Sequence, residues 1–211
     1  MRSTSKSILL LTPIFGTGLF IILYFIATLL YPGGSIVDEN SIGFSWTNNY
    51  WCNLLNQQAI NGENNTARPI ALAAMFILCL TLSLFWFIIP KHILTNKKLM
   101  LTIQICGILA MTTAFLLLTN INHDLAINIA CSFGVIATAG TLIGLYNTKW
   151  YGLFAFGLLN ILLVGLNNYV YRTGGLIVYL PVVQKITFIL FLAWICTINI
   201  KAYRKQNKRK H

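Results

Sequence analysis

The sequence predicts an all-α membrane protein: a polytopic bundle of about six transmembrane helices with a short interfacial helix in its first outer loop. The first observation is composition, since 57% of the residues are hydrophobic, 9% are charged and the mean hydropathy is +0.73. An ordinary soluble domain is far more polar. The second is a series of apolar runs, each long enough to cross the hydrocarbon core as a helix of about 20 residues. Residues 1–211 are therefore expected to form a single integral membrane domain.

Six apolar runs are the candidate transmembrane helices. They cover residues 8–31, 69–90, 99–119, 125–146, 150–171 and 182–202. The first run is too long for the apolar region of a signal peptide and has no A-x-A-like cleavage site after it, so a retained helix is expected. Pro181 is expected to mark the start of the sixth helix, because the residue before a proline disfavours helical conformation.

The distribution of Lys and Arg predicts the orientation of these helices. With the N-terminus inside, only three cations face outward, Arg68, Arg172 and Lys185, and the remaining twelve of fifteen are cytoplasmic. Cytoplasmic loops carry the excess of positive charge in membrane proteins. Both termini are therefore expected in the cytoplasm, in a multi-pass protein of the cell membrane, which in a bacterium is the inner membrane.

The basic tail, residues 203–211, follows the sixth run directly. Cations in that position attract the anionic lipids of the inner leaflet. Because the positive charge flanks apolar runs and is not spread over a soluble surface, nucleic acid is not an expected partner. Membrane lipids are the expected partners, and the oligomeric state is left open.

The connection between the first two helices, residues 32–68, is the only long outer loop. It exceeds the 12 to 15 residues beyond which a connection tends to be either functional or disordered. From residue 48 onward, apolar side chains recur at helical spacing, with Thr47 as a cap and Asn61-Gly62 as a stop. This pattern predicts a short amphipathic helix lying flat. Its aromatic residues are Trp46, Tyr50 and Trp51. They are either interfacial anchors or part of a lid over a lipid- or substrate-binding cleft.

Polar and charged residues gather at the predicted outer face. The candidate cluster consists of Asp38, Glu39, His123, Asp124, Asn128, Arg172 and Lys185. Two interpretations are open. In one, the charges belong to ordinary loops or pair between helices, as Asp124 could with Arg172 or Lys185. In the other, the cluster forms a site in which His123 carries a proton near neutral pH and the cations hold a phosphate or carboxylate.

Signatures of metal, cofactor and nucleophile chemistry are missing from the sequence. Of the three histidines, His92 and His211 are expected on the opposite side of the membrane from His123, which excludes a His-rich zinc site. Neither a G-x-S-x-G nor a Walker-type loop occurs, and the five cysteines form no CxxC pair. No metal or cofactor is expected, catalytic residues are not identified, and an enzyme is the less favoured class.

The layout resembles uncharacterised small bacterial membrane proteins of the domain-of-unknown-function 998 group and, more remotely, the DRAM-like six-helix proteins. The features that carry the resemblance are the six helices, the Pro32-Gly33-Gly34-Ser35 segment followed by Asp38, and His123-Asp124 at the third turn. The resemblance implies a six-helix membrane fold along the whole chain. It implies no known activity.

Three functions remain open at this point. The first is a non-enzymatic protein that binds or senses a lipid or small amphiphile from the outer face. The second is a transporter or permease, which polar residues within the helices would serve, namely Gln104, Asn128 and Asn160. The third is a membrane-embedded lipid-modifying enzyme that uses His123 and Asp124.

Overall fold

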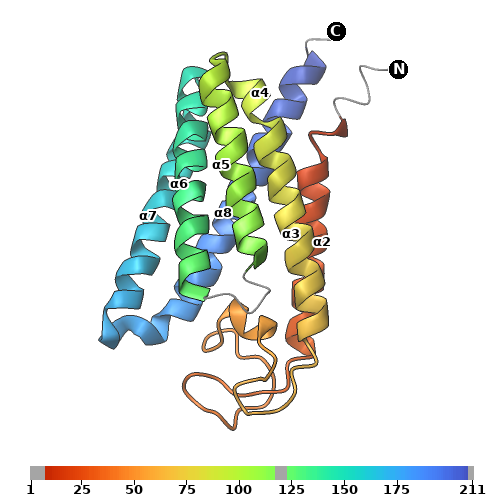
Figure 1. Cartoon of the computed structure of the whole chain (residues 1–211), viewed down its shortest axis with the longest axis vertical. Helices are drawn as coiled ribbons and strands as arrows, with labels where there is room; N and C mark the ends of the chain where they lie inside the picture. The colour runs from red at the N-terminus through yellow and green to blue at the C-terminus, as the bar shows by residue number, and fades with distance from the viewer. Residues whose placement is uncertain (1–7, 117–122, 209–211) are drawn as a thin grey trace. The chain divides into compact units, whose positions relative to one another are not determined.

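A computed structural model describes residues 8–116 and 123–208, without the side chains of residues 123–127. Its described part is helical and contains no strand, which confirms the predicted all-α class (Figure 1). The elements in chain order are α2 (Thr12–Leu29), η1 (Trp51–Leu55), α3 (Arg68–Ile88), α4 (Pro90–Ile93), α5 (Lys97–Leu116), α6 (His123–Asn147), α7 (Tyr151–Arg172), η2 (Gly174–Tyr179) and α8 (Leu180–Lys208).

Six helical segments in the described residues are long and apolar enough to cross a membrane. They are Thr12–Leu29, Arg68–Ile93, Lys97–Leu116, Asn128–Asn147, Tyr151–Arg172 and Gly174–Lys208. Many of their large apolar side chains are exposed, among them Phe15, Leu29 and Leu162. Soluble monomers rarely expose apolar surface on this scale. The chain therefore has the make-up of a multi-pass membrane protein.

Pro90, the last residue of the second predicted run, and Pro181, the expected start of the sixth helix, both lie inside helical segments. Pro90 occupies the first turn of α4, directly after α3, and Leu94 N donates to Pro90 O at 3.0 Å. Pro181 is the second residue of α8, which begins at Leu180 and not at 182. Proline is tolerated in the first turn of a helix because the missing N–H has no partner there in any case.

The end of the chain differs from the expected basic tail. Helix α8 continues to Lys208, so most of the segment predicted as a tail is helical. The indole ring of Trp150 lies against this end of the helix, with Lys201 Nζ 5.0 Å and Lys205 Nζ 5.3 Å from its ring centroid. Cations stacked on an aromatic face stabilise the helix they belong to. The contact lies where α8 continues beyond residue 202.

Two compact units make up the chain. Unit 1 comprises Met1–Gly18, Phe76–Leu158 and Ala193–His211, and unit 2 comprises Leu19–Met75 and Leu159–Leu192. Helices α2, α3, α7 and α8 contribute residues to both. The expectation of a single membrane domain stays a prediction.

In unit 1, glycines mark the close approaches among α3, α5 and α6. A Cβ atom on Gly107 of α5 would lie 2.2 Å from Cγ of Trp86 in α3. One on Gly140 of α6 would lie 2.5 Å from Cγ1 of Ile103 in α5. Helices α5 and α6 lie side by side along their length (Figure 1). Small residues allow helix backbones to approach closely where no hydrophobic effect drives helices together in lipid.

A glycine also allows α6, α7 and α8 to approach closely within unit 1. A Cβ atom on Gly157 of α7 would lie 2.4 Å from Leu142 of α6 and 2.8 Å from Trp194 of α8. The indole Nε1 of Trp194 also donates to Leu153 O at 2.8 Å. A large aromatic side chain facing a glycine, with its one polar atom paired, fills the interface without an unsatisfied donor. In unit 1, large side chains of one helix thus pack against glycines of the next.

Unit 2 has an aromatic core beneath the long loop, which we define as residues 30–67. The rings of Phe20 and Tyr24 from α2, Trp51 from η1 and Phe188 from α8 contact one another at centroid separations of 4.9 to 6.2 Å. Aromatic pairs in this range add stability beyond the area they bury. The long loop is therefore part of the core of unit 2 through Trp51.

Candidate functional site

The long loop begins with a turn that requires glycine. Gly34 has φ +83°, and a Cβ atom there would lie 2.4 Å from the backbone nitrogen of Asn61. Gly34 N donates to Ser41 O at 2.7 Å, and Gly33 forms a β-bridge with Ile42. Positive φ and close backbone approach are both accessible to glycine at little steric cost. Gly33 and Gly34 thus let a second part of the loop pack against the first.

Asn49 is a fully buried residue that ties three segments together. Its Oδ1 accepts a hydrogen bond from Ser45 N at 2.8 Å, and its Nδ2 donates to Gly34 O at 2.8 Å. Its main-chain oxygen accepts a hydrogen bond from Lys185 Nζ. A buried amide must have partners, because an unpaired polar group in a dry interior costs free energy. Asn49 therefore fixes the loop both to itself and to α8.

Lys185 enters this network from the second turn of α8. Its side chain is only 6% exposed, and Nζ donates to Asn49 O and, at 3.0 Å, to Pro181 O. The ring of Phe44 lies with its centroid 5.6 Å from Nζ. The ammonium group is thus balanced by carbonyl dipoles and a ring face.

Asn65 is a second buried amide, located before α3. Its Nδ2 lies within hydrogen-bond distance of three main-chain oxygens, those of Asn53 and Leu54 at 3.2 Å and of Asn56 at 2.9 Å. Its Oδ1 accepts from Ala67 N at 3.1 Å. These oxygens close the end of η1. Asn65 thus supplies the partners that a short helix lacks at its own terminus.

The predicted amphipathic helix is reduced to a single short 3₁₀ segment. It spans Trp51–Leu55, with Tyr50 before it and Asn56 after it, both extended. Asn53 Oδ1 accepts from Tyr50 N at 2.6 Å, which favours a turn at this place. Thr47 and Gly62 therefore do not bound the helix. Asparagine side chains compete for the backbone hydrogen bonds that a longer α-helix would need.

Trp51 ties η1 to two helices of unit 2. Its main-chain oxygen accepts from Tyr24 Oη at 3.0 Å, and its main-chain nitrogen donates to Gln184 Oε1 at 3.4 Å. Trp46, in contrast, is 46% exposed and stacks on Phe25 with a centroid separation of 6.2 Å. The aromatic residues named from the sequence therefore divide: Trp51 packs inward and Trp46 faces outward, while Tyr50 is half-buried.

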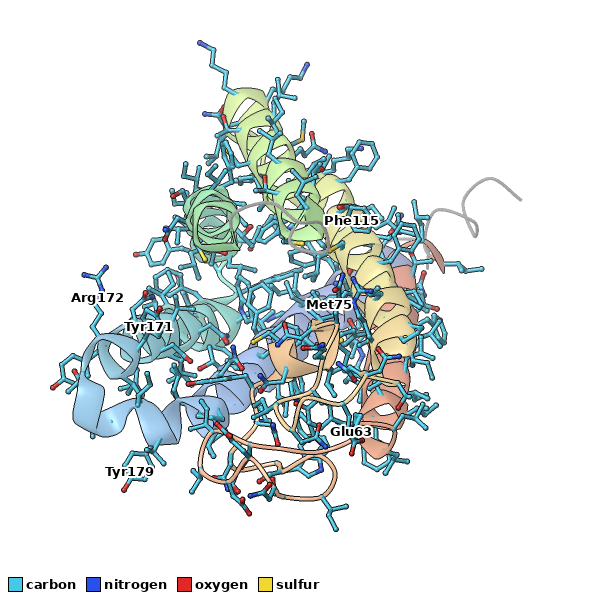
Figure 2. All side chains as sticks on the ribbon, turned by 60° about the horizontal axis from the view of Figure 1, so that its bottom comes forward. Glu63, Met75, Phe115, Tyr171, Arg172 and Tyr179 are labelled. Carbon is cyan, nitrogen blue, oxygen red and sulfur yellow. The ribbon has the colours of Figure 1, made fainter. Side chains whose placement is uncertain are left out.

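Of the predicted polar cluster, Lys185 takes part in the buried contacts described above. Asp38 and Glu39 are exposed, and Asp38 Oδ1 accepts from Asn40 N at 3.0 Å. Arg172 is exposed at the end of α7 and extends away from it (Figure 2). Asn128 is exposed on α6.

The side chains of His123 and Asp124 lie outside the described residues. Convergence of the cluster on one site, and any pair that Asp124 forms with Arg172 or Lys185, therefore stay predictions. Among the described side chains, no group of three or more His, Cys, Asp or Glu residues could hold a metal ion.

Burial also changes the acidity of groups in the long loop. It raises the pKa of the Cys52 thiol, an effect larger than the opposing influence of a backbone hydrogen bond and of Lys185. Burial likewise raises the pKa of Tyr31, whose hydroxyl oxygen accepts from Ile60 N at 3.0 Å. Removing these groups from water disfavours their charged forms. Cys52 is therefore a protonated, weakly nucleophilic thiol at neutral pH.

Sequence reasoning missed Asn49 and Asn65 as the residues that organise this region. The available signal was a loop rich in Asn and Gly that also carried too many aromatics for a solvated linker. Nothing in the local sequence separates these two from their exposed neighbours such as Asn56 and Asn64. Besides local hydrogen bonds to Ser45 and Ala67, their partners come from residues 9 to 136 positions away.

Comparisons with known proteins add no relative to this description. No protein-family model, no curated protein and no solved structure matches the chain. The resemblance to the domain-of-unknown-function 998 group stays an expectation drawn from the sequence, and the function has to be inferred from the molecule itself.

Proposed function

We propose that this chain is a multi-pass protein of the cell membrane that binds or senses a lipid or small amphiphile through its long loop on the outer face. The observation that carries the proposal is a set of exposed apolar side chains on a loop that is otherwise firmly braced. They are Ile36, Val37, Ile42 and Trp46. Ile42 is 98% exposed. We call these four residues the apolar rim.

The apolar rim is presented by backbone that is held in place. Ile42 pairs with Gly33, and Asn49 and Lys185 fix the segment that follows Trp46. An apolar side chain on a braced backbone cannot turn inward to bury itself. Exposed apolar groups of this kind are typical of surfaces that contact a membrane or an apolar ligand. Trp46, with an apolar ring and a polar N–H, suits the boundary between headgroups and acyl chains.

Fluorescence quenching tests the proposal directly. Wild-type protein and Trp46→Phe are reconstituted in phosphatidylcholine nanodiscs with and without bromine near the headgroup end of the acyl chains. The difference between the two proteins isolates the emission of Trp46, and we expect bromine to quench it strongly. Trp51→Phe is the matched control, and its half-buried indole should be quenched much less. An unquenched, water-exposed Trp46 would contradict the proposal.

The sidedness belongs to the proposal and has its own test. An impermeant thiol reagent added to intact cells should label Ile42→Cys, whose position is the most exposed of the apolar rim. Lys97→Cys, at the exposed start of α5, should be labelled only after lysis. The reverse pattern would place the long loop in the cytoplasm, against the distribution of Lys and Arg.

Anionic lipids of the inner leaflet are proposed partners at the other end of the chain. Lys201 and Lys205 hold their ammonium groups against Trp150, on a helix that carries further cations to Lys208. Juxtamembrane cations each attract anionic headgroups by about 1 kcal/mol. The Lys201→Gln/Lys205→Gln variant should retain less phosphatidylglycerol than Lys97→Gln/Lys98→Gln, which removes the same charge. Equal retention would refute this partner assignment.

The residues that suggested the two alternative functions lie in different surroundings. Gln104, which suggested transport, is buried and donates from Nε2 to Phe87 O at 2.6 Å, so it joins α5 to α3. Asn128 faces outward on α6. The lipid-modifying enzyme depends on His123 and Asp124, whose side chains lie outside the described part of the chain.

A further inference from the structure

A polar pocket opens beside the start of α3, apart from the apolar rim. Its volume is about 510 Å³. It is lined by Gln57, Asn64, Asn65, Thr66, Arg68 and Pro69. All of these residues belong to unit 2, and the lining contains one cation and no acid.

The walls of the pocket are fixed by backbone pairing. Asn65 N donates to Gln57 O at 3.0 Å, and Gln58 forms a β-bridge with Asn64. The buried amide of Asn65 holds the chain behind these walls. A pocket whose walls are already ordered loses little conformational entropy when a ligand binds.

Arg68 is oriented by a hydrogen bond that leaves most of its donors available. Its Nε donates to Leu55 O at 3.1 Å, and the side chain is half-buried. The two terminal nitrogens of the guanidinium form the fork that recognises phosphate or carboxylate oxygens. The carbonyl of Leu55 thus fixes the plane of a charged group beside the pocket.

The other polar side chains of the lining differ in whether they can donate a hydrogen bond to a ligand. The hydroxyl of Thr66 donates to Leu30 O at 2.6 Å and is occupied. Gln57 and Asn64 are exposed, and both belong to the lining of the pocket. One guanidinium and two amide donors around an acid-free pocket match the oxygens of a single phosphate group.

We infer that this pocket binds the phosphate of an anionic lipid headgroup, an assignment that rests on the proposed function and adds its ligand class. Arg68 is the first residue of the candidate span Arg68–Ile93, so its guanidinium lies at the level where an apolar helix meets the headgroups. A free phosphate ester has the same recognition chemistry but no acyl chains to place alongside that span. The lipid is therefore the ligand that the position of the pocket favours.

Native mass spectrometry of the full chain tests this inference. Protein from nanodiscs of phosphatidylcholine and phosphatidylglycerol is released into detergent, and the retained phosphatidylglycerol is counted. Arg68→Gln should weaken retention about tenfold, because it removes charge-assisted hydrogen bonds. Arg172→Gln is the matched control, since it removes the same charge from an exposed side chain of unit 2, and it should retain lipid like the wild type (Figure 2). The cations of α8 are unchanged in both variants.

Three results would overturn the inference. The first is wild-type retention by a folded Arg68→Gln protein, and the second is an equal loss in Arg172→Gln. The third is saturable, Arg68-dependent binding of free glycerol phosphate as tight as that of the lipid, which would assign the pocket to a soluble ester. If Arg68→Gln does not fold, the double variant Gln57→Ala/Asn64→Ala tests the inference in its place. It should lower the retention of phosphatidylglycerol about threefold. Quenching of Trp46 by brominated lipid is independent of all these outcomes.

Discussion

Lys185 Nζ donates a hydrogen bond to the main-chain oxygen of Asn49, a residue 136 positions earlier in the chain. The contact joins α8 to the middle of the long loop and buries a cation against carbonyl dipoles. Taking a charge out of water is costly, so this arrangement is stable only while its acceptors stay in place. The loop and the start of α8 are consequently one cooperative structure within unit 2.

Substitution of the Lys185 ammonium should loosen the long loop. We expect Lys185→Met to lower the free energy of unfolding by about 1–3 kcal/mol, because Asn49 O is left buried without its donor. Hydrogen exchange should also accelerate at Asn49 N, which donates to Ser45 O at 2.9 Å. Lys98→Met, at an exposed position, is the control and should change neither quantity. A variant as stable as the wild type would show that burying the charge costs as much as its hydrogen bonds contribute.

The buried amide of Asn65 should contribute more to the free energy of unfolding than the exposed amide of Asn56. Asn65→Ala removes the donor to three carbonyls and the acceptor for Ala67 N, so we expect a loss of about 1–3 kcal/mol. Asn56→Ala removes an exposed side chain and should cost less than about 0.5 kcal/mol. Equilibrium unfolding in mixed micelles with increasing dodecyl sulfate measures both. Equal losses would mean that the network around Asn65 is not stabilising.

The glycine contacts of unit 1 predict a steric effect at single positions. Gly107→Ala places a Cβ atom 2.2 Å from Trp86 Cγ, so α3 and α5 must separate, at a cost of about 1–3 kcal/mol. Gly134→Ala on α6 meets nothing within 4 Å and is the matched control. Because alanine is the better helix former, the control should be neutral or slightly stabilising in the same unfolding experiment. A tolerated Gly107→Ala would rule out close packing at this contact.

The raised pKa of Cys52 predicts slow and strongly pH-dependent alkylation. The thiolate is the nucleophile, and burial favours the thiol, so the rise in labelling rate should occur at a higher pH than for an ordinary cysteine. The comparison is Ile42→Cys combined with Cys52→Ala, labelled by the same charged maleimide. Its exposed thiol should react faster at neutral pH and reach its maximum rate at lower pH. Coincident pH profiles would show that Cys52 is solvated.

How far the sequence predicts the site can be judged from individual residues. Lys185 could be singled out because a charge within an apolar helix needs partners. The two acceptors that the structure describes, the carbonyls of Asn49 and Pro181, could not be predicted, because the contact with Asn49 depends on how the long loop folds. Arg68 appeared in the sequence only as an outward cation. Its orientation by Leu55 O and its place in a pocket depend on how the long loop folds back on itself.

The sequence by itself determined the helical class and the six apolar segments, because a run of about 20 apolar residues in hydrocarbon has to satisfy its own backbone as a helix. That constraint is local and can be read from composition alone. The tertiary structure decided the rest: the single 3₁₀ turn in place of an amphipathic helix, the inward Trp51 and outward Trp46, and the two buried asparagines that brace the loop. The two asparagines act largely through hydrogen bonds to residues that are not their neighbours in sequence, and the spacing of residues along the chain does not reveal such partners.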